Sequence, residues 1–176
     1  MNAGTILIID AVIVIGLIVV FGHRLIKNYY RKIQTPDAYM IQNVQSGLVI
    51  RPQNAEIADC VPIIQYTPKN WECTTWQMIG IGNNEYLLKD LYTQKSFAPV
   101  GEIKAGTLLE QRPIGNDQHQ HWIFERQTDD KYSIRLADSN LFITSVGGAV
   151  DERITLQTET NSANQLWTLH QQNPII

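Results

Sequence analysis

The hydrophobic and polar positions of the chain follow two different patterns. Residues 3–22 read AGTILIIDAVIVIGLIVVFG, with Asp10 as the one ionisable side chain among them. As a helix this stretch would extend about 30 Å, the thickness of the hydrocarbon core of a bilayer. From residue 37 onward, short runs of alternating apolar and polar residues are separated by turn residues, which is typical of β-strands. The pattern predicts one transmembrane helix, residues 1–22, followed by an all-β domain, residues 37–176.

The segment between them, residues 23–36, is basic and is predicted to be a juxtamembrane helix and linker. No Lys or Arg precedes the apolar stretch, and a secretory signal peptide would need one there. We therefore expect an uncleaved anchor. Because excess Lys and Arg mark the cytoplasmic flank, the N-terminus is predicted to lie outside and the domain on the cytoplasmic side. The alternative is that the small folded domain is exported in spite of the basic flank that precedes it. The side chains expected to contact lipid headgroups are Arg24, Lys27, Arg31 and Lys32.

Asp10 lies inside the apolar stretch, where an unpaired carboxylate would cost on the order of 3 kcal/mol. One interpretation is a hydrogen bond or ion pair with another membrane subunit, since a single-span protein has no second helix to satisfy the group. The other interpretation is a protonated or locally hydrated Asp close to the interface.

The predicted β domain repeats itself three times. Two landmarks keep the period: Tyr39, Tyr86 and Tyr132 open similar segments, and each segment closes on a tryptophan, Trp76, Trp122 and Trp167. The segments between them also align, as Ile63–Tyr66, Leu108–Gln111 and Ile154–Gln157. Three repeats of about 45 residues, each unable to bury its apolar face alone, predict a closed β-trefoil with the tryptophans as equivalent core anchors.

The ends of the repeats resemble the Gln-x-Trp motif of the ricin B-type lectin family. Gln120-His121-Trp122 and Gln165-Leu166-Trp167 match the motif, and Thr74-Thr75-Trp76 keeps the tryptophan. The resemblance extends over residues 37–171. It implies a β-trefoil and carbohydrate binding, although the motif's Gln and Trp mainly build the fold and each sugar site has to be checked separately.

A sugar site of this family needs an acidic side chain, an aromatic ring and an Asn directly before the motif's Gln. Paired hydroxyls require charged acceptors, and the apolar face of a sugar packs on a ring. No repeat is complete. The acid position falls near Arg51 in the first repeat, near Ala98–Val100 in the second and at Thr144 or Ser145 in the third.

The remaining positions are retained in part. The first repeat has Tyr66 as the ring but Cys73 and Thr74 in place of Asn and Gln, and the second has Gln111 and Arg112 at the ring position and His119 before Gln120. The third repeat keeps Asn164 and Gln165, has Gln157 in place of the ring, and offers Asp151 from an altered loop as a substitute acid. The third repeat is therefore predicted to be the best sugar candidate.

Composition excludes several other functions. From residue 38 onward 10 basic residues face 15 acidic ones, so a nucleic-acid partner is not expected. The sequence contains no Cys-x-x-Cys, nucleophile elbow, phosphate-binding glycine loop or His-Glu-x-x-His, and we expect no catalysis, cofactor or metal. His119 and His121 are two residues apart and could share a metal from one face of a strand, but the sequence shows no third metal ligand beside them. Cys60 and Cys73 would form a disulfide only if the domain were exported.

The sequence thus predicts a non-enzymatic single-pass membrane protein. Its trefoil is expected to act as an interaction or scaffold module, an accessory subunit of a larger membrane complex, with lipids and other membrane subunits as partners. The alternative is a membrane-tethered lectin that binds glycans.

Overall fold

The computed structural model describes residue 22 and residues 35–174. Apart from Gly22, the predicted transmembrane helix lies outside these residues, and so do Asp10 and the basic side chains of residues 24–32. Among the described residues, no helix combines the length and the mean hydropathy that crossing a bilayer requires.

From residue 38 onward the chain forms short antiparallel strands. The strands are β1 (Ala38–Asn43), β2 (Val49–Pro52), β3 (Ile63–Tyr66), β4 (Trp76–Gly82), β5 (Glu85–Asp90), β6 (Ser96–Pro99), β7 (Leu109–Arg112), β8 (His121–Arg126), β9 (Lys131–Leu136), β10 (Leu141–Ser145), β11 (Ile154–Thr158) and β12 (Leu166–Gln171). Short 3-10 turns are η1 (Gln53–Ala55), η2 (Glu72–Thr74), η3 (Gln118–Gln120) and η4 (Ala163–Gln165). The alternating sequence pattern explains the strands: in β8, Trp122 and Phe124 are buried while their neighbours are partly exposed.

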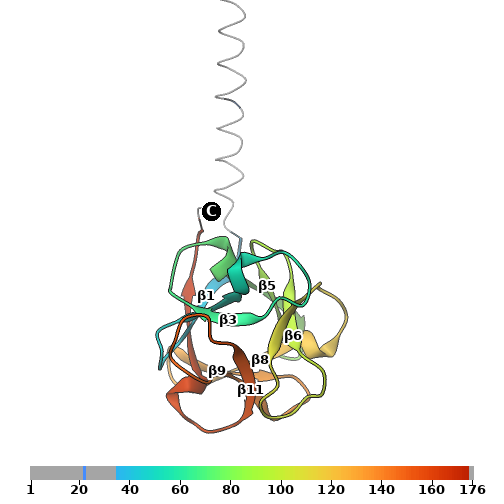
Figure 1. Cartoon of the computed structure of the whole chain (residues 1–176), viewed down its shortest axis with the longest axis vertical. Coiled ribbons are helices and arrows are strands. Elements are labelled where there is room, and N and C mark those ends of the chain that lie inside the picture. The colour runs from blue at the N-terminus through green and yellow to red at the C-terminus, as the bar shows by residue number, and fades with distance from the viewer. Residues whose placement is uncertain (1–21, 23–34, 175–176) are drawn as a thin grey trace, which may run out of the picture. The chain divides into compact units, whose positions relative to one another are not determined.

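The first and last strands of each repeat close into a barrel. Its order is β1, β4, β5, β8, β9, β12 and back to β1, all antiparallel. The middle strands pair as the hairpins β2–β3, β6–β7 and β10–β11. Figure 1 shows the three repeats following one another in colour from blue-green through yellow to red. Closure leaves no free barrel edge, because every barrel strand has two neighbours.

Backbone hydrogen bonds join the three hairpins in a cycle. One residue in each hairpin loop has a positive φ and donates its N–H to a strand of the next repeat: Cys60 to Gln111, Gly106 to Leu156, and Asp151 to Gln65. The N–H groups of those three strand residues return bonds of 2.7–2.8 Å to Val61, Thr107 and Glu152. Each repeat is therefore held by the one that follows it, and the third is held by the first.

The core contains the three repeat tryptophans, all with no exposed surface. The indole N–H of Trp76 donates to the Ile50 carbonyl over 3.0 Å, and that of Trp167 donates to the Ile143 carbonyl over 3.1 Å. The buried indole N–H of Trp122 has no partner among the described residues. Phe97 packs between Trp76 and Trp122, with centroid distances of 5.0 and 4.9 Å. The three tryptophans are thus equally buried but differ in their ring contacts and in their hydrogen bonding.

The strand register changes one detail of the repeat alignment. Ile50, Phe97 and Ile143 occupy the same place in the three hairpins, and they lie opposite Gln65, Gln111 and Leu156. The second repeat therefore aligns as Leu109–Arg112, one residue later than the sequence alignment placed it. The position equivalent to Tyr66 is consequently Arg112 and not Gln111.

Candidate functional site

The hairpin register shows which side chains occupy the sugar-site positions. Arg51, Ala98 and Thr144 lie opposite Ile64, Glu110 and Thr155, so these three residues share the acid position. The ring position holds Tyr66, Arg112 and Gln157. As the sequence indicated, no repeat places a carboxylate at the acid position.

In the first repeat, the residue at the acid position packs on the ring. The guanidinium carbon of Arg51 lies 3.6 Å from the centroid of Tyr66, a cation–π contact. Arg51 is 7% exposed, and no carboxylate lies within 4 Å of it among the described residues. Its buried Nε also lacks a partner in that part of the chain. The cluster therefore has a hydrogen-bond donor at the position where the resemblance to ricin B-type lectins implies an acceptor.

Trp71 completes this cluster and was not predicted from the sequence. It precedes η2, its ring centroid lies 6.3 Å from that of Tyr66, and the two planes are inclined by 32°. Trp71 is 37% exposed. A Trp five residues after the predicted ring, in the polar segment TPKNW, was the available signal. Arg51, Tyr66 and Trp71 together form what we call the first-repeat cluster.

The glutamines of the Gln-x-Trp motifs, Gln120 and Gln165, hold neighbouring loops in place by hydrogen bonds. Gln165 is 2% exposed; its Nε2 donates to Thr144 Oγ1 and to the Thr158 carbonyl, and its Oε1 accepts from the N–H of Thr160. Gln120 similarly donates to the Pro113 carbonyl over 2.8 Å. The Gln165 amide is therefore already used within the fold, which leaves it little capacity for a ligand.

The structure separates the remaining third-repeat candidates. Asn164 is half-buried and its Oδ1 accepts from Ser162 Oγ over 2.7 Å, next to Gln165. Asp151 lies in the β10–β11 loop, where its backbone contacts Gln65 of the first repeat. Its carboxylate makes no hydrogen bond to Asn164 or Gln165 among the residues described.

The second-repeat side chains are occupied by local ion pairs. Arg112, at the ring position, pairs with Glu110 on the same strand. His119 Nδ1 lies 3.3 Å from Asp117 Oδ1, and His121 Nδ1 lies 2.9 Å from Glu85 Oε2. The two histidines thus contact different carboxylates, and across residues 35–174 no group of three metal-ligating side chains is found.

Sequence comparisons give no relative. No protein-family model matches the chain, and no curated protein matches it significantly. Solved structures do match. The designed threefold symmetric protein ThreeFoil superposes with a TM-score of 0.73 over 76% of this chain and 97% of its own, at 18% identity. The Macrolepiota procera ricin B-like lectin in complex with lactose gives 0.68 over 80% and 99%, at 18% identity. An exo-β-1,3-galactanase from Clostridium thermocellum gives 0.71 over 76% of this chain and 30% of its own, at 20% identity.

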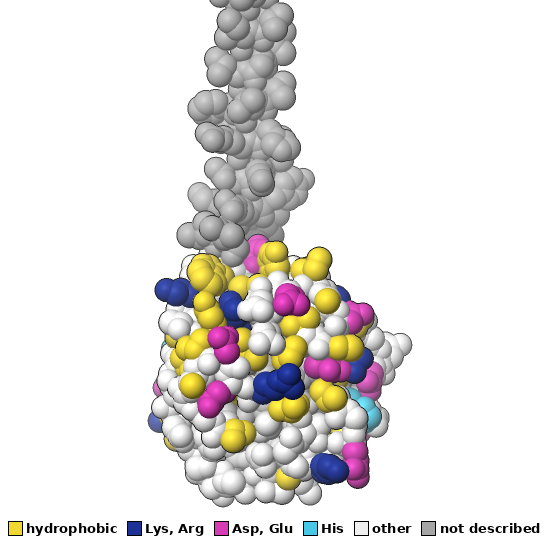
Figure 2. All heavy atoms as spheres, in the orientation of Figure 1, with side chains coloured by type: hydrophobic (Ala, Val, Ile, Leu, Met, Phe, Trp, Pro, Cys, Tyr) yellow, Lys and Arg dark blue, Asp and Glu magenta, His cyan; other side chains and the backbone are white. Residues whose placement is uncertain are grey.

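The described domain is a β-trefoil. This agrees with the fold predicted for residues 37–176, while the predicted anchor before it lies outside the residues described. Figure 2 shows acidic and basic side chains interspersed on one face of the trefoil, with no basic patch gathered on that face.

Two buried ionisable groups of the trefoil lie near the first-repeat cluster. Burial raises the pKa of Asp90 to about 7, although the backbone N–H groups of Thr93 and Tyr92 donate to its Oδ1. Its Oδ2 is buried without a partner among the described residues. Burial also raises the pKa of Cys73, against the opposing charge of Arg51. Cys73 is thus a poor nucleophile, whereas Cys60 is exposed, and both thiols are free.

Proposed function

We propose that the trefoil is a non-enzymatic carbohydrate-binding module and that its main site is the first-repeat cluster. The observation that carries this is the partly exposed Trp71 beside Tyr66 and Arg51, at the position where the resemblance to ricin B-type lectins places a sugar. A ring next to hydrogen-bond donors can pack against the apolar face of a sugar and fix its polar groups. The lectin with lactose, similar to this chain in fold, supports the same function.

The ligand class follows from the exchange of the acid for Arg51. A carboxylate accepts hydrogen bonds from hydroxyls, whereas a guanidinium donates and favours carboxylates. Among the described residues no carboxylate lies within 4 Å of Arg51, so its guanidinium group is not paired with an acid and can pair with an acidic ligand. We therefore propose that the cluster prefers acidic sugars, such as uronic acids, over neutral ones.

Replacing Trp71 by alanine is expected to weaken glycan binding about tenfold, because the contact between ring and sugar is lost. The full-length protein on a glycan array gives the ligands, and titration calorimetry with the best ligand gives the dissociation constants. Tyr92→Ala is the matched control, since Tyr92 is another exposed aromatic side chain, 51% exposed, outside the cluster. We expect it to bind as the unaltered chain does.

The third repeat is tested in the same experiment. Asn164→Ala is expected to leave binding unchanged if the first-repeat cluster is the site, and loss of binding would move the site to the third repeat. Absence of binding to every glycan would contradict the carbohydrate proposal and favour a scaffold role for the trefoil.

We also propose that residues 3–22 anchor the chain with the trefoil on the cytoplasmic side, where lipids and other membrane subunits, contacted through Asp10, are its partners. The support is the sequence pattern: an apolar stretch followed by four basic residues.

Cys60 provides a measurement of this orientation. An impermeant maleimide is expected to leave intact cells unlabelled and to label Cys60 after lysis, because that thiol is exposed. Cys60→Ser should abolish labelling of the folded protein, since Cys73 is buried with a raised pKa. Labelling of intact cells that disappears in Cys60→Ser would overturn the cytoplasmic placement.

A further inference from the structure

A cavity opens at the end of the barrel that faces away from the hairpins. It has a volume of about 750 Å³, within the range of small-molecule pockets. The tyrosines that open the three repeats line it, together with one side chain from the closing strand of each repeat, two residues after the repeat tryptophan: Tyr39, Tyr86, Tyr132, Met78, Phe124 and Leu169. The cavity thus has the threefold character of the fold. Rings and apolar side chains form much of its wall, and Gly80 and Asn84 also line it.

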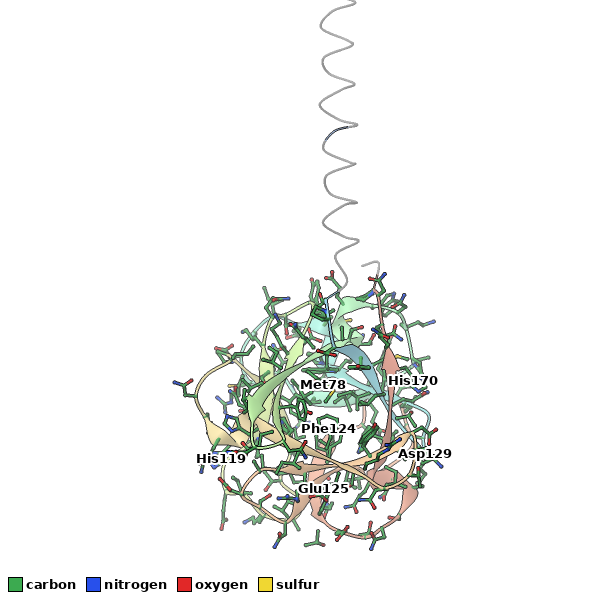
Figure 3. All side chains as sticks on the ribbon, turned by 180° about the vertical axis from the view of Figure 1, so that it is seen from behind. Met78, His119, Phe124, Glu125, Asp129 and His170 are labelled. Atoms are coloured by element: carbon green, nitrogen blue, oxygen red, sulfur yellow. The ribbon has the colours of Figure 1, made fainter. Side chains whose placement is uncertain are left out.

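The rings of this cavity stand at steep angles to one another. Phe124 lies between two tyrosines: its centroid is 5.7 Å from that of Tyr86, with planes at 87°, and 6.3 Å from that of Tyr132, with planes at 70°. Figure 3 shows Met78 and Phe124 near the middle of the domain and Asp129 toward its edge. Rings that meet almost at right angles line the cavity in different orientations. Ring faces carry the negative part of the aromatic quadrupole and attract cations.

The rim of the cavity is acidic. Among the described residues its charged members are Asp37, Asp129 and Asp130, and no Lys, Arg or His of that part of the chain contributes to the lining. Asp129 has Arg126 at 3.6 Å, and Asp130 accepts a long hydrogen bond of 3.5 Å from Thr128. Asp37 has no ion-pair partner within residues 35–174. Aromatic walls and a carboxylate rim favour the same sign of ligand charge.

We propose that this cavity binds a small organic ammonium ion that carries apolar substituents. Its positive charge would lie against the tyrosine and Phe124 rings and near the rim carboxylates, and its alkyl groups against Met78 and Leu169. An anion would be repelled by the rim. The site is formed by the barrel strands and is separate from the hairpin positions where sugars are expected, so it does not depend on the carbohydrate proposal.

Choline and its uncharged isostere 3,3-dimethylbutan-1-ol provide the direct test. Titration calorimetry on the full-length protein is expected to show choline binding about tenfold more tightly than the alcohol, because only the charge differs. Equal affinities, or no binding of choline, would overturn the proposal.

Phosphocholine distinguishes a free ammonium ion from a lipid headgroup, which has the same quaternary nitrogen. We expect it to bind more weakly than choline, since its phosphate would face the acidic rim. Tighter binding of phosphocholine would overturn the assignment to a free ammonium ion.

Three variants locate the site. Gly80→Met should abolish binding by filling the cavity; a Cβ at residue 80 has Tyr86 Cε1 as its nearest neighbour, at 3.9 Å, so the backbone tolerates it. Asp130→Asn, an exposed change outside the core, should weaken choline binding about threefold and leave the alcohol unaffected. The matched control Glu159→Gln, also exposed but outside the lining, should bind choline normally. Unchanged choline affinity in both cavity variants would overturn the site.

Discussion

Asp90→Asn is expected to raise the free energy of unfolding by about 4 kcal/mol at pH 8. The carboxylate is fully buried, and desolvation raises its pKa from the ordinary 3.8 to about 7. Above that pH the folded protein must hold a buried charge, which an amide removes.

The first repeat already contains the asparagine. Asn43 occupies the same place at the end of β1 as Asp90 at the end of β5, and its Oδ1 accepts from two backbone N–H groups in the same way. The Asn43 amide also donates to the carbonyls of Asn164 and Leu166. Pseudo-threefold symmetry places the carbonyls of Cys73 and Thr75 at the corresponding positions around Asp90. An asparagine there would have acceptors for the amide group that replaces the unpartnered Oδ2.

The pH dependence follows from the direction of the shift. Between pH 3.8 and about 7 the unfolded chain has lost the Asp90 proton while the folded chain retains it. The unfolded state therefore binds fewer protons, and the contribution of Asp90 makes stability fall as pH rises through this window. Below pH 3.8 both states are protonated and the penalty vanishes.

Urea unfolding of the full-length protein at pH 4 and pH 8 measures this effect. Asp90→Asn should raise the free energy of unfolding strongly at pH 8 and only slightly at pH 4. Asp138→Asn, the same change at an exposed residue, should change the free energy of unfolding little at either pH. An equal gain at both pH values would show that burial of the charge is not the cause.

Trp76→Ala is expected to lower the free energy of unfolding by about 4 kcal/mol, the cost of removing a fully buried indole. The side chain packs edge-on against Phe97 at 5.0 Å and donates a hydrogen bond to Ile50. Its loss leaves a void that β-strands closed into a barrel cannot fill by moving together. Thermal or urea unfolding measures the change.

Phenylalanine substitutions separate the two contributions. Trp76→Phe and Trp167→Phe each remove an indole hydrogen bond, which the buried N–H of Trp122 does not make among the described residues. Trp122→Phe should therefore cost about 1 kcal/mol less than either. Equal costs in all three would contradict the unequal hydrogen bonding of the repeats.

The trefoil could be predicted from the sequence because its signals are periodic. Trp76, Trp122 and Trp167 recur with the repeat, and alternation marks the strands around them. The register within β7 was wrong by one residue, since neighbouring apolar residues such as Leu108 and Leu109 give the same pattern in either frame. Strand pairing fixes that frame and pattern alone does not.

The candidate sites depend on contacts between segments, which the sequence does not reveal. Arg51 was recognised as a departure from the acid position, but its stacking on Tyr66 becomes visible only when β2 and β3 pair. Asp151 was placed with Gln165 because both belong to the third repeat, yet its loop contacts the first. Tyr39, Tyr86 and Tyr132 served as markers of strand starts, and barrel closure brings them to one cavity.

The pairing of β1 with β12 has a consequence for synthesis of the protein. Tyr39 lies opposite Gln171, and Gln172 donates to the Ala38 carbonyl over 2.9 Å. On a ribosome, β1 is the first of these strands to emerge, and its partner β12 is synthesised only after two further repeats. Until then its edge is open to pairing with other chains, as unpaired edges generally are. Chaperone protection during translation would matter most for this strand, and shortening the chain before Leu166 would expose the edges of both β1 and β9 permanently.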